Sequence, residues 1–407
     1  MRLSAGVAVL GTLVVAGLLV LPRSRAQPIT GVEEVVSLSV PDCDGLAAGD
    51  MDGDGDLDLL SSASQDGRVF WFEQRGSPRR WRRHEVYDAA YDAPKIEGNA
   101  LGDFDGDGRL EGVSLDQRAA RVLLHVRGDD PDRPWQTVAL RTDRATLQDA
   151  LVADLGEDGT PDLLYTWEGD RAGRGGIHRL TLTGTDPLSP SHWQDRALVT
   201  HESAWWLAPR LFDLNGSGLR RDLIYTARHH LGRNPGSRPG VFWLDAPDSN
   251  GPWRRHTIDD RLPHPLHVDA GQLTADGPPH DLVVGGFEVS RVYWYDADGW
   301  NRHSLDLPPI AGTRVGRVWN VETVPVPDQR RDAVLAIAEA DGESAMVLFQ
   351  WRGDHYEPTV LEHLPYGHAM EDRILCRDLL GDPMPELIIA DSGGGQLRIL
   401  RFTRSGR

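Results

Sequence analysis

The chain has 407 residues, of which 40% are hydrophobic, and a formal net charge of −19. This length exceeds one ordinary compact domain and the apolar content excludes a disordered chain, so we expect several domains or a repeat architecture. The negative charge argues against a protein that binds nucleic acid through its phosphates.

Residues 1–26 have the pattern of a targeting segment. Arg2 precedes an apolar stretch that ends at Leu21, and the small residues Ser24 and Ala26 form a suitable cleavage site. A cleaved signal peptide is the favoured interpretation. An uncleaved N-terminal membrane anchor is the alternative, because the apolar stretch is long. Either way we expect a secreted or periplasmic protein, in a compartment where calcium is plentiful enough to fill weak sites.

An aspartate-rich motif then repeats along the chain. Full copies begin at Asp50 and Asp103. Copies that keep only part of the motif begin at Asp154 and Asp213, and the copy at Asp378 lacks the middle ligand. Each copy ends in an acid that precedes an apolar run, and two further units keep only this exit acid. The exit acids are Asp58, Glu111, Asp162, Asp222, Asp281, Asp332 and Glu386. Seven units with a period of 51 to 60 residues predict a propeller or a solenoid.

Each unit has the pattern of four short strands, which is one propeller blade. Apolar runs flank the loop, a third run carries aromatic residues, as in Val69–Phe72, and a fourth carries Trp-x-Arg-His, as in Trp81–His84. Residues 27–407 are therefore expected to form an all-β, seven-bladed β-propeller of four-stranded antiparallel blades. Only two strands remain after Glu386, so we expect Val32–Val40 to complete the last blade and close the ring.

The aspartate loops and the Trp-x-Arg-His strands resemble the FG-GAP and VCBS-type repeats of calcium-binding propellers. The resemblance covers nearly the whole chain after residue 26 and implies this fold and this metal. It implies no particular reaction, because such propellers range from adhesion modules to sugar lyases and dehydratases.

The alternating acids are expected to hold structural Ca²⁺, because carboxylates that point inward from a tight loop are the hard oxygen ligands that calcium prefers. An EF-hand is excluded, since Ser61 and Ser114 stand where its glutamate would be. The ligand candidates are Asp50, Asp52, Asp54, Asp58, Asp103, Asp105, Asp107, Glu111, Asp154, Asp158, Asp162, Asp213, Asn215, Ser217 and Asp222.

A ligand would bind at the opposite end of the ring, in the funnel formed by the links between blades. Polar and aromatic residues in these links include Glu97, Gln148, Arg317 and Trp319. The candidates for catalysis are His264, His267, His368, Lys95 and Arg373. Lys95 is the single lysine of the chain. The Trp-x-Arg-His strands recur on several blades, so we interpret them as packing elements.

Two functions remain open. One is an extracellular binding module for a glycan or a protein, and the other is a carbohydrate lyase or dehydratase with its active site in the funnel. No nucleic-acid partner is expected, and membrane contact is expected only if the N-terminal segment is uncleaved.

The two cysteines, Cys43 and Cys376, are expected to stay unpaired. Their distances from their loops place them about 16 Å apart in depth, whereas a disulfide needs Cα atoms within about 7 Å.

Overall fold

The computed structural model describes residues 27–142, 146–168, 175–201, 204–214, 222–229, 239–245, 253–262, 264–274, 281–287, 290–327, 329–364 and 374–404. The predicted targeting segment, residues 1–26, lies outside these ranges. Within them, no helix has the length and apolar character needed to cross a membrane.

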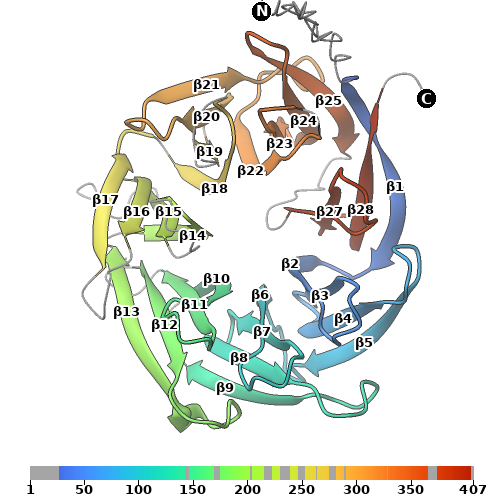
Figure 1. Ribbon diagram of the computed structural model, residues 1–407, viewed down its shortest axis with the longest axis vertical. Helices are drawn as coiled ribbons and strands as arrows, with labels where there is room; N and C mark the ends of the chain where they lie inside the picture. Colours follow the sequence, from blue (N-terminus) through green and yellow to red (C-terminus); the bar gives the residue numbers. More distant parts are fainter. Residues whose placement is uncertain are drawn as a thin grey trace, which may run out of the picture.

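Seven four-stranded antiparallel sheets surround a central axis, which confirms the predicted seven-bladed propeller (Figure 1). From the innermost strand outward, blade one contains β2 (Cys43–Gly49), β3 (Asp58–Ala63), β4 (Arg68–Gln74) and β5 (Trp81–Asp88). Blade two contains β6 (Ile96–Gly102), β7 (Glu111–Asp116), β8 (Arg121–Val126) and β9 (Gln136–Thr142). Blade three contains β10 (Thr146–Ala153), β11 (Asp162–Glu168), β12 (Gly175–Leu182) and β13 (Trp193–His201), with the short helix η1 (Pro190–His192) before its last strand.

The remaining blades keep the same order. Blade four contains β14 (Ala204–Phe212), β15 (Asp222–His229), β16 (Gly240–Asp245) and β17 (Arg254–Asp259). Blade five contains β18 (Pro265–Gly271), β19 (Asp281–Gly286), β20 (Arg291–Tyr295) and β21 (Arg302–Asp306). Blade six contains β22 (Arg317–Val324), β23 (Ala333–Ala340), β24 (Glu343–Trp351) and β25 (Tyr356–Leu364). Blade seven contains β26 (Ile374–Arg377), β27 (Glu386–Asp391), β28 (Gln396–Arg404) and β1 (Ile29–Ser39).

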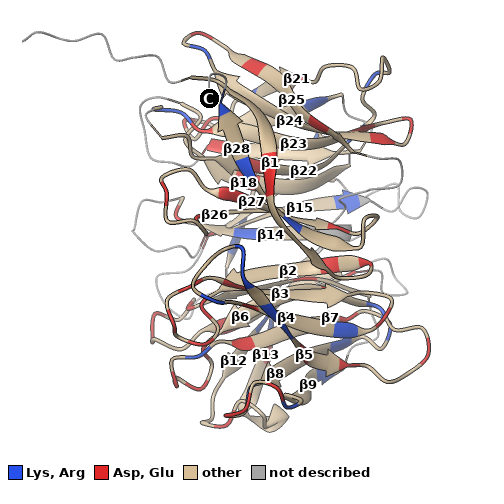
Figure 2. Cartoon of the chain, turned by 90° about the vertical axis from the view of Figure 1, so that its right-hand side faces the viewer, with Lys and Arg blue, Asp and Glu red and all other residues tan. Residues whose placement is uncertain are grey.

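The N-terminal strand closes the ring, as predicted. Strand β1 pairs antiparallel with β28 from Ile29 opposite Arg404 to Ser39 opposite Gln396, and the two strands lie side by side at the rim (Figure 2). The buried carboxamide of Gln350 in blade six accepts a hydrogen bond from the Ile29 N–H at 2.8 Å and donates one to the Ile29 carbonyl at 2.7 Å. The closing strand β1 is therefore hydrogen-bonded to blade six as well as to blade seven.

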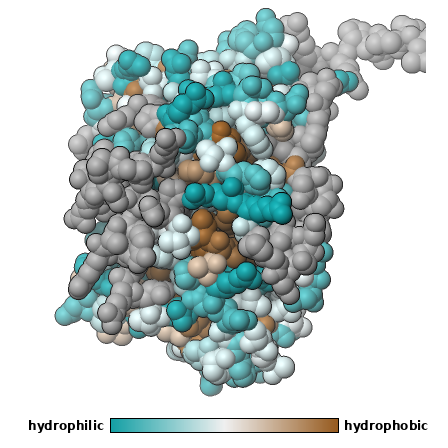
Figure 3. Space-filling model, turned by 90° about the vertical axis from the view of Figure 1, so that its left-hand side faces the viewer, coloured by the Kyte–Doolittle hydropathy of each residue, from teal (hydrophilic) through white to brown (hydrophobic). Residues whose placement is uncertain are grey.

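The core lies between adjacent blades. Leu163 and Tyr165 of blade three pack with Leu115 of blade two, and Val283 of blade five packs with Val334 of blade six. Because each second strand is covered on both faces, strands such as β3 and β27 are buried at every residue, including their polar residues. Outermost strands such as β5 and β17 are largely exposed, and the left-hand side of the ring shows a group of apolar residues among hydrophilic ones (Figure 3).

The Trp-x-Arg-His strands are packing elements, as interpreted from the sequence. The histidine stacks on the tryptophan of the preceding strand in the pairs Trp71–His84, Trp243–His256 and Trp294–His303, with ring centroids 4.0 to 4.7 Å apart. A carboxylate two residues after that tryptophan holds the ring: Glu73 lies 2.8 Å from His84, and Asp296 lies 3.0 Å from His303.

A β-bulge interrupts the pairing of the first strand in blades one to six. One extra residue lies between Cys43 and Leu46 in β2, and equivalent register shifts occur in β6, β10, β14, β18 and β22. A bulge redirects the side chains beside it. These bulges ring one end of the channel, so they orient the side chains at that end.

Both cysteines are free thiols, as predicted. Cys43 is buried on β2, where its Sγ donates to the Gln396 carbonyl at 3.2 Å. Cys376 is partly buried on β26.

Candidate functional site

Two ends of the ring carry the candidate sites. The loop end carries the connections between first and second strands, including residues 50–57 and 103–110. The funnel end carries the links from one blade to the next and the connections between second and third strands.

The first aspartate loop folds around the side chain of Asp50. Its carboxylate accepts hydrogen bonds from the N–H groups of Gly53 at 2.8 Å, Asp54 at 3.1 Å and Gly55 at 3.0 Å. Gly53 and Gly55 have φ angles of 81° and 95°, a region that favours glycine. The second loop repeats this geometry, with Asp103 accepting from Gly106 and Gly108. The Asp-x-Asp-Gly-Asp-Gly pattern therefore determines the backbone conformation of the loop and also supplies its carboxylates.

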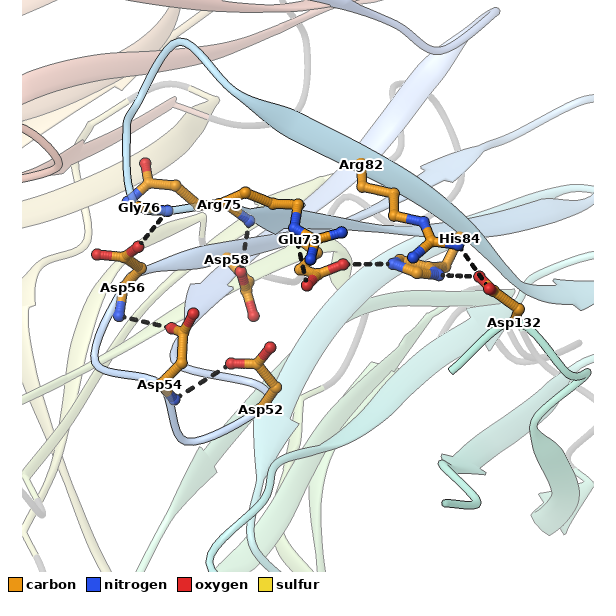
Figure 4. A network of polar contacts seen from close by, with 11 residues as sticks. Asp52, Asp54, Asp56, Asp58, Glu73, Arg75, Gly76, Arg82, His84 and Asp132 are labelled. Atoms are coloured by element: carbon orange, nitrogen blue, oxygen red, sulfur yellow. Dashed lines mark hydrogen bonds and ion pairs between the residues drawn. The ribbon is translucent and has the colours of Figure 1, made fainter. Parts of the chain in front are cut away.

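Each of these two loops brings three carboxylates together. Asp50, Asp52 and Asp58 form one cluster, and the other consists of Asp103, Asp105 and Glu111; in each, one oxygen per residue lies within 4.8 Å of the others. Asp54 and Asp107 are outside these clusters. Asp54 accepts from the Asp56 N–H at 2.9 Å (Figure 4), and Asp107 forms an ion pair with Arg109.

The clusters have the electrostatics of cation sites. Burial, together with the charge of neighbouring acids, raises the pKa of Asp58 to about 7 and that of Glu111 to about 8. A divalent cation would remove this repulsion, since an opposite charge at close range favours the ionised carboxylate. The donor sets, entirely carboxylate oxygen, fit a hard cation such as Ca²⁺.

The exit acid has a second role in nearly every blade. It accepts a hydrogen bond from the second residue of its own loop: Met51 to Asp58, Phe104 to Glu111, Leu155 to Asp162, Leu214 to Asp222, Leu273 to Asp281 and Leu379 to Glu386. This bond is present in blade five, whose loop lacks the leading aspartates. The exit acid therefore recurs partly because it anchors the loop backbone.

The third loop differs from the first two. Asp154 accepts from the Asp158 and Gly159 N–H groups, but its exit acid Asp162 forms an ion pair with Arg179 at 2.7 Å. The guanidinium of Arg179 therefore supplies the positive charge beside Asp162 that a metal ion would otherwise supply.

The fourth and seventh loops complete the comparison with the predicted ligands. In the fourth, Asp213 and Asp222 are described, whereas Asn215 and Ser217 lie outside the described residues. In the seventh, Oε1 of the buried Glu386 has no hydrogen-bond partner within the described part of the chain.

A second cluster of charged and amide groups lies at the funnel end of blades two and three. Lys95 forms an ion pair with Glu97, and Gln117 donates to the other oxygen of Glu97 at 2.6 Å. Gln148 donates to Oε1 of Glu168 at 2.5 Å. These residues come from β6, β10, β11 and the adjoining links, so the ring brings together side chains from two blades.

The β-bulges shape this funnel cluster. Gly98 is the extra residue of β6, with a φ of 54°, and a Cβ there would lie 2.8 Å from the Gln148 carbonyl. Glycine therefore lets blade two approach blade three closely, which sets Glu97 beside Gln148 and its partner Glu168.

The carboxyls of the funnel cluster are perturbed. Burial, and then the charge of Asp44, raise the pKa of Glu97 to about 8, against the opposing effect of Lys95. Burial also raises the pKa of Glu168 well above its usual range. Perturbed acids of this kind gather at functional sites, although structural networks also produce them.

The described catalytic candidates lie in two separate parts of the ring. Lys95 belongs to the funnel cluster, His264 lies at the start of the first strand of blade five, and His267 is only 2% exposed on β18. His368 and Arg373 lie outside the described residues. Gln117 and Glu168 were missed by the sequence reasoning. Their only signal is a polar residue at or just after the end of a second strand.

These features define a seven-bladed β-propeller with carboxylate clusters at one end and a charged funnel at the other. Residues 50–114 match the family model of the FG-GAP-like repeat, and the chain therefore carries an FG-GAP-like repeat. A comparison with curated proteins gives no match.

Solved structures similar to this chain support the fold. The Dos1 propeller has a TM-score of 0.52 at 10% identity, over 89% of this chain and 77% of its own. The exotype rhamnogalacturonan lyase YesX has a TM-score of 0.50 at 15% identity, over 94% and 75%. A chain of the mitotic checkpoint complex has a TM-score of 0.51 at 14% identity, over 97% and 98%. At these identities the likeness concerns the fold alone.

Proposed function

We propose that this protein is a secreted or periplasmic propeller that binds a glycan at its funnel end and is stabilised by calcium at its loop end. The observation that carries the proposal is the funnel cluster around Lys95, Glu97 and Glu168. It joins an ammonium group, carboxyls and carboxamides at the mouth of the channel, and these groups donate and accept hydrogen bonds as sugar hydroxyls require.

Glu168 is the most specific element of this proposal. It is 3% exposed, and its Oε2 has no hydrogen-bond partner within the described part of the chain. A buried acceptor without a partner is destabilising. A ligand hydroxyl that donates to Oε2 would remove this penalty.

Calcium would have a structural role in this account. Asp50, Asp52 and Asp58 would hold one ion, and the corresponding acids of the second loop would hold another. The bound cation would neutralise each cluster and fix the connection between the two innermost strands of its blade.

A glycan array tests the binding proposal. We expect the protein to bind a defined set of glycans and the Glu168→Gln variant to lose about tenfold or more in affinity, because an amide nitrogen replaces one carboxyl oxygen and the hydrogen bond made there is lost. Glu85→Gln is the matched control, since Glu85 is 52% exposed on an outer strand. Binding to proteins but to no glycan would overturn the proposal.

A carbohydrate lyase or dehydratase is the second candidate. The observation in its favour is the pKa of Glu97, about 8, beside Lys95, because an acid–base group works best when its pKa is near the working pH. The test is the absorbance of an unsaturated product during incubation with the glycans that bind. Product formation that Glu97→Gln abolishes would support the enzyme, and bound glycan that stays intact would support the binding module.

A further inference from the structure

Two arginines surround one aromatic ring at the funnel end of blades four to six. The Arg228 Cζ lies 4.1 Å from the ring centroid of Phe287, and the Arg317 Cζ lies 5.2 Å from it. Arg228 comes from β15, Phe287 follows β19, and Arg317 begins β22. A backbone bridge between Phe287 and Arg317 joins blades five and six at this point. We call Arg228, Phe287 and Arg317 the arginine wall.

Trp319 and Glu339 contact the arginine wall and hold its side chains in place. Trp319 packs edge-on against Phe287 at 4.9 Å and donates its indole N–H to Glu339 at 2.5 Å. Glu339 also accepts from Arg317 at 3.4 Å, a long bond that leaves the 46% exposed Arg317 side chain accessible. A guanidinium stacked on a ring keeps its N–H donors in its own plane, so its edge can still bind a planar carboxylate.

The funnel therefore has two walls of different chemistry. Blades two and three present the carboxyl groups of Glu97 and Glu168, and blades four to six present the guanidinium groups of Arg228 and Arg317. The two walls interact: burial raises the pKa of Glu168, and the charge of Arg228 acts in the opposite direction. The net charge of −19 does not cancel the local positive charge, because charges are screened beyond about 8 Å at physiological salt.

We infer that the arginine wall binds the carboxylate of an acidic sugar while the funnel cluster binds hydroxyls of the same glycan, an inference that rests on the proposed glycan-binding function. A carboxylate matches the planar donor edge of a stacked guanidinium in a way that a neutral hydroxyl does not. The ligand class is thus a glycan that contains uronic acid residues.

The test compares oligouronates with the same oligosaccharides after their carboxylates have been reduced to alcohols. Affinities are measured by calorimetry for the full chain and for Arg228→Gln and Arg317→Gln. Arg314→Gln is the matched control, because Arg314 also lies in a link at the funnel end but donates to Ser290 and contacts no described aromatic ring. Thermal unfolding of each variant reports whether its fold is intact.

We expect the acidic oligosaccharide to bind at least tenfold more tightly than its reduced form. We expect each wall variant to reduce this preference by about tenfold, the lower end of the effect of one charge-assisted hydrogen bond, and the control to leave it unchanged. Equal affinity for the two forms would overturn the inference while the proposed glycan binding stood. A preference for sulfated over carboxylated sugars would overturn the carboxylate assignment. No binding of any glycan, acidic or neutral, would overturn both proposals.

Discussion

Both ends of the ring carry clusters of carboxyl groups, but the two kinds of cluster are assembled in different ways. At the loop end, carboxylates come from within nine residues of one another, as in Asp50 and Asp58, and each cluster belongs to one blade. At the funnel end, Glu97 and Glu168 come from different blades and lie close together because blades two and three pack against each other. Local clusters suit a repeated stabilising ion, whereas a cluster assembled once suits a single ligand.

This difference decides what the sequence could predict. The loop motif fixes its own conformation through Asp50 and the glycines Gly53 and Gly55, so the motif indicates the site. The spacing of the exit acids indicates the seven units, and the two strands left after Glu386 indicate the closing strand. The funnel depends on β-bulges and on the approach of Gly98 to the next blade, and neither has a sequence signature over a few residues. Lys95 was therefore found as a candidate, but its ion pair with Glu97 and the hydrogen bond from Gln117 to Glu97 were not.

The largest expected effect concerns calcium at the loop end. A chelator should lower the melting temperature, because an ion present at 100 times its dissociation constant stabilises the native state by about 2.7 kcal/mol per site. Asp52→Ala and Asp105→Ala should each remove much of this response, and Asp382→Ala should change it little. Calorimetric unfolding with and without calcium measures it. Melting that is insensitive to the chelator in all these proteins would contradict the role of the loops.

A glycine substitution tests the close packing of blades two and three at the funnel end. Gly98→Ala should destabilise the fold by about 1 to 3 kcal/mol more than Gly76→Ala. Both glycines have positive φ, 54° and 63°, but a Cβ at Gly98 would meet the Gln148 carbonyl, whereas a Cβ at Gly76 would meet nothing within 4 Å. Denaturant unfolding measures the difference. Equal losses would show that the close approach of blades two and three is not needed.

The pH dependence of stability provides a further test of the same end. The pKa of Glu97 rises from 4.5 to about 8 on folding, mainly through burial. The folded chain therefore keeps a proton that the unfolded chain has released, and Glu97 contributes stability that is lost as pH rises through this window. Glu97→Gln should lose less stability than the parent between about pH 5 and pH 8. Denaturant unfolding across that range checks this, with Glu85→Gln as the exposed control; parallel curves for all three proteins would contradict it.

The division of roles between the two ends is the central claim, and a binding isotherm tests it most directly. A glycan identified on the array is titrated into Asp52→Asn and Glu168→Gln at a temperature where both are folded. The account predicts that Glu168→Gln weakens binding at least tenfold and that Asp52→Asn leaves the affinity unchanged. Loss of binding in Asp52→Asn with full affinity in Glu168→Gln would contradict it.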